Sequence, residues 1–336
     1  MIRLPKFDFI APESLTEALT VLSRGNGDMK ILAGGTDLLA GMKEGLFIPK
    51  CILWLGKLKE LRRIQFSPEE GLSIGAMCTL SDLEQDHDVN RYFPSLVSAA
   101  RSIASPQVRN RATVGGNLCL NTRCIYYDQS EFWRSALGYC LKLGSGICHA
   151  APELDRCSAA FCSDLAPLLI ALGATVELVN SESMRTLRLA DLYVNDGSSH
   201  LAIRSSEILC RIVIPYSPVV RSAHAKWRVR NSIDFPLVNV GVSLAVSDSD
   251  RCDRGRIVIG AVASTPLDIA EAAKAIAGKR LAEDVIDLAA AKASDEVHPL
   301  PTVDESVSHR KKMVRVLVKR ALNEALRQAG PGRGLK

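Results

Sequence analysis

The sequence predicts an α+β fold made of two unequal α/β parts followed by a separate α+β domain at the C-terminal end. Three observations predict it: apolar strands around a Gly-Gly turn near the start, short strands alternating with helices in the middle, and a long amphipathic helix at the end. The 336 residues, 47% of them hydrophobic, suffice for two or three hydrophobic cores.

The first part, residues 1–56, has the pattern of a small βαβ unit. Ser14-Leu-Thr-Glu17 is a capping-box sequence, which predicts the start of a helix. A strand over 29–33 runs into the turn Gly34-Gly35, a second helix follows this turn, and another apolar strand is predicted over 51–55. The glycine turn therefore stands between a strand and a helix.

The second part, residues 57–217, predicts a larger mixed sheet with helices. It contains a second glycine turn, Gly115-Gly116, and Ser163-Asp164 is expected to cap a helix. Pro215 and Pro218 mark a linker to the next domain. We expect helices over 93–103 and 163–172, and strands over 72–76, 175–178 and 207–214.

The third part, residues 218–330, is expected to open at Trp227 to Arg230 and to contain strands over 238–246 and 257–262. It closes with a helix in which apolar residues recur every four positions, an amphipathic pattern typical of a helix that packs one face on a core. These positions are Met313, Leu317, Ala321 and Ala325.

The charge and the apolar runs exclude several classes of protein. Lys and Arg number 42 against 37 Asp and Glu, so the net charge is +5 and is spread along the chain, which gives no indication of a nucleic-acid partner. Apolar runs fall short of the roughly 20 residues that a membrane span needs, and residues 1–11 do not resemble a signal peptide. We therefore expect a cytoplasmic protein without membrane contact, whose ten cysteines are reduced.

The two glycine turns are candidates for a phosphate site. At Gly34-Gly35 the lack of side chains lets the backbone approach a phosphate, and the following helix offers free N–H groups. The turn matches neither the G-x-G-x-x-G nor the P-loop pattern. A tight turn without a ligand would explain one such pair, but a second turn, Thr113-Val-Gly-Gly-Asn117, could hold the same diphosphate from the other side.

Three motifs in register resemble a known family. Ile31-Leu-Ala-Gly-Gly-Thr-Asp-Leu38, Ala112-Thr-Val-Gly-Gly-Asn117 and Cys162-Ser-Asp-Leu-Ala-Pro167 are similar to the FAD-binding signatures of the flavin subunits of xanthine dehydrogenase and carbon monoxide dehydrogenase. Ile233-Asp-Phe-Pro-Leu-Val-Asn239 and Ala263-Ser-Thr-Pro-Leu267 resemble their C-terminal domain. The resemblance covers nearly the whole chain and implies a two-part PCMH-type FAD-binding domain.

The resemblance also assigns the residues that bind FAD. Asp164 would contact the sugar or adenine side, Lys226 would lie close to the flavin ring, and Ile103 and Leu209 would pack against it. Thr36 and Asp37 could equally be helix caps. The residues implied for the diphosphate are Ile31, Leu32, Ala33, Gly34, Gly35, Thr36, Asp37, Leu38, Thr113, Val114, Gly115, Gly116 and Asn117.

A cysteine-rich segment at about residues 119–160 separates the second and third motifs. Six of the ten cysteines fall within residues 118–162, whereas Cys51, Cys78, Cys210 and Cys252 lie singly in apolar stretches typical of core positions. Cys124, Cys140, Cys148 and Cys157 are surrounded by polar and small residues. They form no C-x2-4-C pair of the kind found in zinc sites, and their irregular spacing suits an iron-sulfur cluster.

The segment resembles the insertion of the 4-hydroxybenzoyl-CoA reductase flavin subunits. The similar stretches run from Asn117 to Cys124, from Tyr126 to Arg134, and over Gly138-Tyr-Cys140 and Arg156-Cys157. The resemblance implies a 4Fe-4S cluster with four ligands, Cys124, Cys140, Cys148 and Cys157. Cys119 is the alternative ligand. His149 could ligate in principle, but we expect it to be an exposed loop residue or to hydrogen-bond to a ligand. We also expect the insertion to pack on its host domain through Tyr126, Tyr127, Phe132 and Trp133.

These resemblances imply an electron-transfer subunit in a molybdenum enzyme that removes the phenolic hydroxyl of 4-hydroxybenzoyl-CoA. The expected partners are a molybdopterin-binding large subunit and a small subunit with 2Fe-2S clusters, in a doubled heterotrimer, with ferredoxin as electron donor. One alternative is the flavin subunit of an aerobic hydroxylase that passes electrons to NAD or a quinone, and another is a zinc-stabilised interaction module. We expect no catalytic residue here, and the histidines outside the insertion are expected at the surface or at helix ends.

Overall fold

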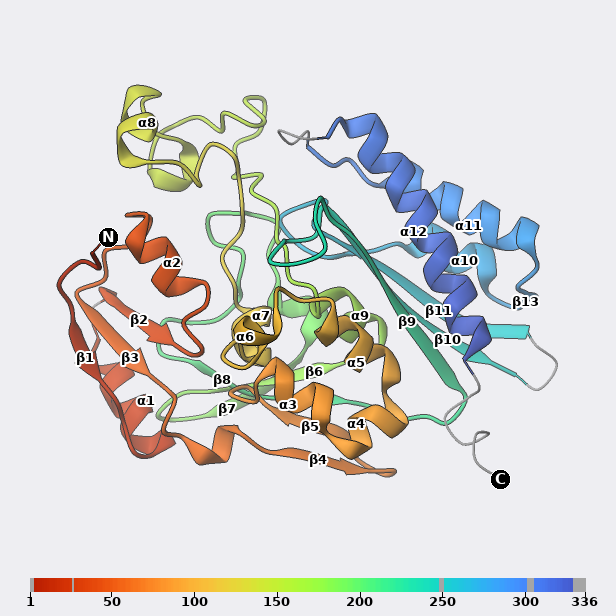
Figure 1. Cartoon of the computed structure of the whole chain (residues 1–336), viewed down its shortest axis with the longest axis horizontal. Coiled ribbons are helices and arrows are strands. Elements are labelled where there is room, and N and C mark those ends of the chain that lie inside the picture. Colours follow the sequence, from red (N-terminus) through yellow and green to blue (C-terminus); the bar gives the residue numbers. More distant parts are fainter. Residues whose placement is uncertain (1–2, 26, 248–250, 301–304, 329–336) are drawn as a thin grey trace.

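The N-terminal part is a three-stranded parallel sheet (Figure 1). The computed structural model describes residues 3–25, 27–247, 251–300 and 305–328. The strand order is β1-β3-β2, and each crossover contains a helix, which confirms the βαβ expectation. The elements are β1 (Asp8–Ile10), α1 (Leu15–Ser23), β2 (Met29–Leu32), α2 (Leu38–Lys43) and β3 (Cys51–Trp54).

The start of α1 differs in one detail from the predicted capping box. Ser14 is the N-cap, and its side chain accepts the Glu17 N–H at 3.2 Å, as expected. The Glu17 carboxylate, however, accepts the N–H of Glu13 at 2.8 Å instead of that of Ser14. The cap satisfies one of the free N–H groups of the first turn, and the reciprocal bond is displaced by one residue.

The middle part is an antiparallel five-stranded sheet in the order β4-β5-β8-β6-β7. Residues from both sides of the insertion meet in it, because Leu72 pairs with Ile214. Its strands are β4 (Ile64–Ser67), β5 (Gly71–Gly75), β6 (Thr175–Val179), β7 (Met184–Arg188) and β8 (Ile208–Ile214). Its α-helices are α3 (Leu80–Gln85), α4 (His87–Tyr92), α5 (Pro94–Arg101), α6 (Pro106–Arg109), α7 (Val114–Leu118) and α9 (Ala166–Ala171), with 3-10 turns at Lys59–Leu61 and Leu189–Leu192.

The insertion projects from this part above α2 (Figure 1). Its two ends meet in a short neck, where Arg123 and Ala160 exchange backbone hydrogen bonds of 2.7 and 2.8 Å. Its regular elements are α8 (Glu131–Ala136) and a 3-10 turn, Leu141–Leu143.

The predicted aromatic packing of the insertion is only partly correct. Tyr127 is buried, but Phe132 is 83% exposed and Trp133 is 37% exposed, so these two do not anchor the insertion. Arg134 does so instead, because its buried guanidinium donates to the carbonyl of Gly45 at 3.1 Å, just after α2. The sequence shows how many aromatic residues the insertion has but not which way their side chains point. The expectation for Phe132 and Trp133 was wrong for this reason.

The C-terminal part is a sheet of order β12-β11-β10-β9, with β13 pairing β11, and its helices lie beside one another on one face (Figure 1). It begins with β9 (Val220–Trp227), so the predicted opening at Trp227 to Arg230 is the end of that strand and the following turn. Leu317 and Ala321 are buried against this sheet, as the four-residue period predicts. The other elements are β10 (Val238–Val246), β11 (Arg251–Gly260), β12 (Leu267–Asp268), α10 (Ala270–Ile276), β13 (Lys279–Arg280), α11 (Glu283–Glu296) and α12 (Val307–Arg327).

Within the described part of the chain, none of the helices has the length and apolar character to span a bilayer. The C-terminal sheet instead packs on the middle part through polar contacts as well as apolar ones. Ser243 donates to the carbonyl of Ala171 at 2.6 Å, and the hydroxyls of Ser95 and Ser222 are 2.7 Å apart. These contacts fix the two parts around the cavity described next.

Candidate functional site

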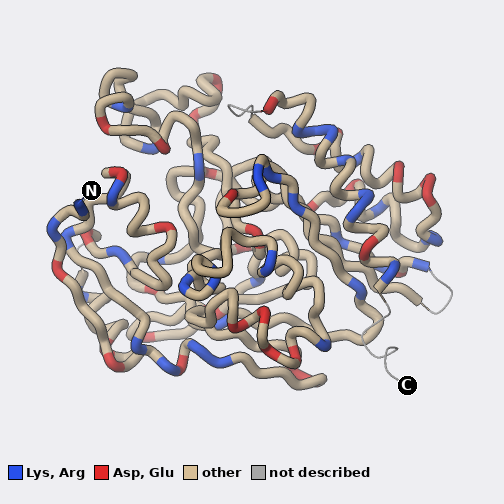
Figure 2. The backbone as a smooth tube through the Cα atoms, in the orientation of Figure 1, with Lys and Arg blue, Asp and Glu red and all other residues tan. Residues whose placement is uncertain are grey.

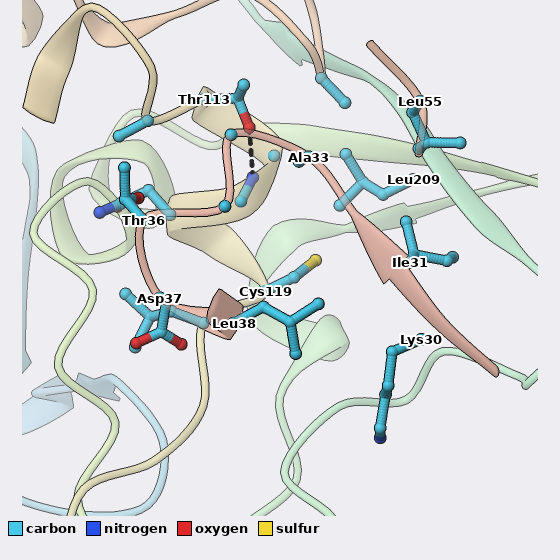
Figure 3. A pocket seen from close by; sticks show the side chains of 18 of the residues that line it. Lys30, Ile31, Ala33, Thr36, Asp37, Leu38, Leu55, Thr113, Cys119 and Leu209 are labelled. Carbon is cyan, nitrogen blue, oxygen red and sulfur yellow. Dashed lines mark hydrogen bonds between the residues drawn. The ribbon is translucent and has the colours of Figure 1, made fainter. Parts of the chain in front are cut away.

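A cavity of about 670 Å³ lies where the three parts of the chain meet (Figure 3). β2 and the first glycine turn form one wall, β8 contributes Leu209, and the loop after β9 contributes Ile233 to Phe235. Fourteen of the 17 residues that the resemblance assigned to FAD line this cavity. They are Ile31, Ala33, Gly34, Gly35, Thr36, Asp37, Leu38, Ile103, Thr113, Gly115, Gly116, Asn117, Asp164 and Leu209.

Three of the assigned residues do not line the cavity. Leu32 and Val114 point into hydrophobic cores, where their exposed fractions are 8% and 0%. Lys226 lies behind the wall formed by Asp164. The motif on β2 includes Leu32 because alternate residues of a strand face opposite sides of the sheet.

The first glycine turn is fixed by a close backbone approach. A Cβ atom added to Gly34 would lie 1.9 Å from the carbonyl oxygen of Arg111, which no side chain could tolerate. Gly35 has a φ of +79°, a conformation in which glycine carries no steric penalty. The turn therefore needs both glycines for its shape, whether or not a phosphate is bound.

The second glycine turn starts the short helix α7. Thr113 is its N-cap, and the Thr113 hydroxyl accepts the N–H of Gly116 at 3.0 Å (Figure 3). The side-chain oxygen of Asn117 accepts from the Ser163 hydroxyl at 2.8 Å and from the N–H of Leu165 at 3.2 Å. Asn117 thus ties the second glycine turn to the third motif.

Asp37 occupies the N-cap position of α2 but makes no capping hydrogen bond with its side chain. Its carboxylate binds Arg123 Nη2 at 2.6 Å and accepts the backbone N–H of Asn121 at 3.3 Å. Arg123 also stacks over the Phe235 ring, with its guanidinium carbon 4.0 Å from the ring centroid. Arg123 lines the cavity, so the neck of the insertion contributes a cation to it. Sequence reasoning missed Arg123, although it is a charged residue directly before Cys124.

The sequence predicts that Ser163-Asp164 caps α9, but Asp164 does not do so. The N-cap is Leu165, and the Ser163 hydroxyl accepts the N–H of Ala166. Asp164 instead lies 2.7 Å from the ammonium group of Lys226, and both side chains are 4% exposed. Lys226 also donates to the carbonyl oxygen of Asp234 at 3.0 Å. Burial raises the pKa of Asp164 to about 6, although Lys226 acts in the opposite direction.

Two sequence-family models match the chain. One, described as the FAD binding domain in molybdopterin dehydrogenase, matches residues 5–217, and the other, the CO dehydrogenase flavoprotein C-terminal domain, matches residues 223–325. The chain belongs to the family of FAD-binding subunits of molybdenum hydroxylases. This flavin subunit is therefore an oxidoreductase subunit with an FAD-binding domain.

Solved structures and curated relatives agree with this assignment. The flavin subunit superposes on a chain of CO dehydrogenase from Oligotropha carboxidovorans with a TM-score of 0.80 at 26% identity, covering 97% of this chain and 100% of the other. The glyceraldehyde dehydrogenase medium chain of Sulfolobus acidocaldarius is 27% identical over 320 residues, covering 95% of this chain and 98% of the relative. The aldehyde oxidoreductase FAD-binding subunit of Escherichia coli is 33% identical over 255 residues, covering 73% of this chain and 78% of the relative.

The four cysteines predicted as cluster ligands lie in the insertion, and three of them are buried: Cys140, Cys148 and Cys157. We call these three and Cys124 the cysteine group. Burial raises the pKa of Cys124 to about 11, while the backbone N–H groups of Tyr126 and Tyr127 lower it. Cys157 and Cys148 also raise the pKa of Cys124, which places these thiols near one another.

The other candidate ligands lie apart from the cysteine group. Cys119 lines the flavin cavity, and burial raises its pKa to about 12. The Nε2 atom of His149 is 2.6 Å from the carbonyl oxygen of Tyr139 and so is already used. Across residues 3–25, 27–247, 251–300 and 305–328, no three His, Cys, Asp or Glu side chains converge tightly enough to hold one metal ion.

Contrary to expectation, His200 is buried and His224 is half-buried in the middle of β9. The Nε2 atom of His200 is 2.9 Å from the carbonyl oxygen of Leu120, and burial lowers the pKa of His200 to about 4. Burial likewise lowers the pKa of His224 to about 3. Both are therefore neutral near neutral pH. No alternating or helical pattern in the sequence marks them as interior positions.

Proposed function

We propose that this chain is the electron-transfer subunit, with FAD and a 4Fe-4S cluster, of a molybdenum enzyme of the 4-hydroxybenzoyl-CoA reductase type. The observation that carries the proposal is the cysteine group: four thiols, three of them buried, in an insertion whose neck reaches the flavin cavity. Removal of the phenolic hydroxyl to give benzoyl-CoA consumes two electrons and two protons and releases water. The role of this subunit is to deliver those electrons.

The cavity residues support FAD binding at the assigned positions. The first glycine turn brings backbone N–H groups to the wall without an obstructing side chain, which suits a diphosphate. The second turn also presents glycines to the wall, but its N–H groups donate within the protein, that of Gly115 to the carbonyl of Ala76 and that of Gly116 to the Thr113 hydroxyl. Ile103 and Leu209 supply apolar surface for a planar ring system, and Asp164 supplies a carboxylate for a hydroxyl or amine donor. When bound, the flavin exchanges one or two electrons, whereas the cluster transfers one at a time.

The insertion supports a cluster better than a single ion. A single metal ion needs its ligands tightly packed around one point, and no such group exists among the described side chains. A cubane holds its four cysteines farther apart, with the cluster between them. Burial raises the pKa of Cys124 and Cys157, and a bound cationic group such as iron would favour their thiolate forms.

The proposal extends to partners and organisation. We propose a molybdopterin-binding large subunit and a small 2Fe-2S subunit in a doubled heterotrimer, with a reduced ferredoxin as donor in the cytoplasm. Curated relatives are named as medium chains or as subunits of complexes, which supports a multi-subunit enzyme. We also propose the division of the chain into residues 1–56, 57–217 and 218–330, with the cluster insertion at about 119–160.

The second candidate is the flavin subunit of an aerobic hydroxylase that passes electrons from substrate to NAD or a quinone. The likeness to CO dehydrogenase chains over 96 to 97% of this chain favours it. It gives the buried cysteine group no role. The third candidate, a zinc-stabilised interaction module, would leave the flavin cavity without a ligand and lacks a compact ligand set among the described residues.

The deciding experiment is analysis of iron, sulfide, zinc and flavin in the anaerobically purified chain, with electron paramagnetic resonance after dithionite reduction. We expect about four irons and one FAD per chain, and loss of iron but not of flavin in Cys140→Ser. Flavin without iron would refute the cluster and favour the aerobic hydroxylase. Zinc without flavin would favour the interaction module.

A further inference from the structure

One lysine of the insertion, Lys142, lies in the segment after Cys140 and makes no direct ion pair among the described residues, although the carboxylate of Asp128 acts on it at longer range. The ammonium group of Lys142 donates to the side-chain oxygen of Asn121 at 2.9 Å, to the carbonyl oxygen of Thr122 at 3.1 Å and to the Thr122 hydroxyl. It also lies 4.4 Å from the centroid of the Tyr127 ring. In the described part of the chain, no carboxylate oxygen lies within 4.0 Å of it. All its direct acceptors are therefore neutral.

Backbone hydrogen bonds place the segment of each cysteine of the group next to the segment of Lys142 or to a residue that Lys142 contacts. Cys140 lies two residues before Lys142, and its carbonyl accepts the Leu143 N–H at 2.8 Å. Cys124 accepts the N–H of Tyr127, the residue whose ring Lys142 covers. The contact with Cys148 is through its neighbour Ile147, whose carbonyl accepts the N–H of Leu141, the neighbour of Lys142.

The contact with Cys157 runs through Gly197. The N–H of Gly197 donates to the Cys157 carbonyl at 2.8 Å, and the Gly197 carbonyl accepts from the Thr122 hydroxyl, which Lys142 also contacts. Burial lowers the pKa of Lys142, whereas Cys157, Asp128, Cys124 and Cys140 each raise it, and Lys142 in turn lowers the pKa of Cys157. The segments that carry the four cysteines are thus joined to the segment of Lys142 by backbone and hydroxyl hydrogen bonds.

A partly buried ammonium group with only neutral acceptors is unfavourable unless an anion lies near. Four thiolates with an iron-sulfur core carry a net negative charge, which grows by one electron on reduction. We propose that Lys142 is a positioning residue that neutralises part of the charge of the cluster in the cysteine group, and so raises the potential at which the cluster is reduced. This inference rests on the proposed function and names a residue that no motif of the resemblance assigns.

Lys142 also stabilises the neck through Asn121. The Asn121 side chain accepts from the Lys142 ammonium group, and its backbone N–H donates to the Asp37 carboxylate in the flavin cavity. A change at Lys142 could therefore loosen the neck instead of acting through charge. The two effects differ in their signatures. Loss of charge moves the potential of the cluster and leaves FAD bound, whereas a loosened neck also lowers FAD content.

The test is a redox titration of the anaerobic holoenzyme complex, in which paramagnetic resonance follows the reduced cluster and visible absorbance follows the flavin. We compare the wild type with Lys142→Met, which removes the charge with little change of shape, and with Lys142→Arg, which keeps it. Arg156→Met is the matched control, because it removes one positive charge beside Cys157 from an exposed side chain. Lys142→Met is expected to shift the midpoint of the cluster to a more negative value, so that the ratio of reduced to oxidised cluster at a fixed potential falls about tenfold.

For Arg156→Met, we expect the ratio of reduced to oxidised cluster at that fixed potential to change less than about twofold, because solvent screens that charge. For Lys142→Arg, we expect a cluster midpoint near that of the wild type. An unchanged midpoint in Lys142→Met, with iron and FAD at wild-type levels, overturns the inference and leaves the proposed function standing. If Lys142→Met loses its iron, the Lys142→Arg variant decides. Retention of iron in Lys142→Arg supports the role of the charge, whereas loss of iron in both variants overturns the inference. Absence of iron from the wild type overturns the proposed function and the inference together.

Discussion

The flavin cavity and the cysteine insertion are built in different ways. In the cavity, the functional backbone stands at the ends of regular elements: β2 ends just before the first glycine turn, and the second glycine turn forms the start of α7. In the insertion, one six-residue helix and one 3-10 turn are its regular elements, and the cysteines are held by backbone hydrogen bonds between loops. The cavity therefore has its shape before any ligand binds, whereas the insertion depends more on what it holds.

The cavity and the insertion also differ in how their charged side chains are paired. Polar atoms of the cavity wall are satisfied mainly by one another, as the Asp164–Lys226 and Asp37–Arg123 pairs show. In the insertion, the direct acceptors of the Lys142 ammonium group are neutral, although acidic and basic residues both occur along the projecting lobe (Figure 2). A bound anionic cluster would complete the second region, while the first is complete as a protein structure. The following predictions test this contrast.

The largest expected effect comes from adding one methyl group to the first glycine turn. Gly34→Ala forces a Cβ atom onto the carbonyl of Arg111, at a cost on the order of 3 kcal/mol, so the turn must move and FAD affinity should fall at least about a hundredfold. Iron content should stay near the wild-type value, because the insertion does not depend on this turn. Flavin absorbance and iron analysis of the purified variant measure both.

The control for Gly34→Ala is Gly146→Ala in the insertion. A Cβ atom at Gly146 meets nothing within 4 Å, and its φ is not in the left-handed region, so both cofactors should be retained. A Gly34→Ala protein with full FAD content would show that the close approach does not shape the flavin site.

The second prediction separates the cysteine group from a nearby cysteine outside it. Cys124→Ser should abolish the iron signal in paramagnetic resonance and leave FAD content unchanged, because a serine hydroxyl is a poor substitute for a thiolate ligand. Cys119→Ser, five residues earlier, should retain the iron, since Cys119 lies on the wall of the flavin cavity. The opposite pattern would make Cys119 the ligand and move the cluster towards the flavin.

The sequence predicts those parts of the molecule whose structure depends on local patterns. The glycine turns were predictable because close backbone approach restricts the residue type, and the core strands because apolar runs are long enough to recognise. Strands β1 and β12, of three and two residues, were missed. Their residues are largely exposed, and pairing with a neighbour alone makes them strands.

The sequence could not predict contacts whose partners come from distant segments. Asp164 has the local pattern of a cap, but its partner, Lys226, is on β9 in another part of the chain. Arg123 and Lys142 lie beside predicted ligands without any pattern that shows their direction. Lys142 is nevertheless the only charged residue between Ala136 and Ile147, and that isolation is a signal that could have singled it out.

The third prediction concerns the pH dependence of stability at the cavity wall. The pKa of Asp164 is raised from 3.8 to about 6, so the folded chain binds this proton more tightly than the unfolded chain. The contribution of Asp164 to the free energy of unfolding is therefore greatest below about pH 4, falls as the pH rises to about 6, and is constant above that. The change is on the order of 1 to 3 kcal/mol.

The measurement is the thermal unfolding midpoint of the wild type and of Asp164→Asn between pH 4 and pH 8. Asparagine does not titrate, so the unfolding midpoint of the wild type should fall relative to that of Asp164→Asn between about pH 4 and pH 6. Above about pH 6 the difference between the two midpoints should stay constant. A constant difference over the whole range would mean that Lys226 holds the pKa of Asp164 near its ordinary value.

The smallest expected effect is at the neck that joins the two regions. Arg123→Met removes the ion pair with Asp37 and the stacking on Phe235. Because both partners of the ion pair are about 30% exposed, the pair contributes only about 1 kcal/mol, and FAD affinity should fall less than about tenfold. Arg188→Met, which breaks an exposed ion pair with Asp191 on a remote strand, should leave FAD affinity unchanged.

The direction of the Arg123→Met effect shows to which region the neck belongs. Arg123 side-chain contacts reach Asp37 at 2.6 Å and the Phe235 ring at 4.0 Å, both on the cavity wall, whereas its ion pair with Asp128 of the insertion is long, at 4.0 Å, and its backbone bonds to Ala160 survive the substitution. FAD affinity should therefore change and iron content should not. A variant that binds FAD normally and loses iron would place Arg123 with the insertion, and the cavity would then be independent of the insertion that projects above it.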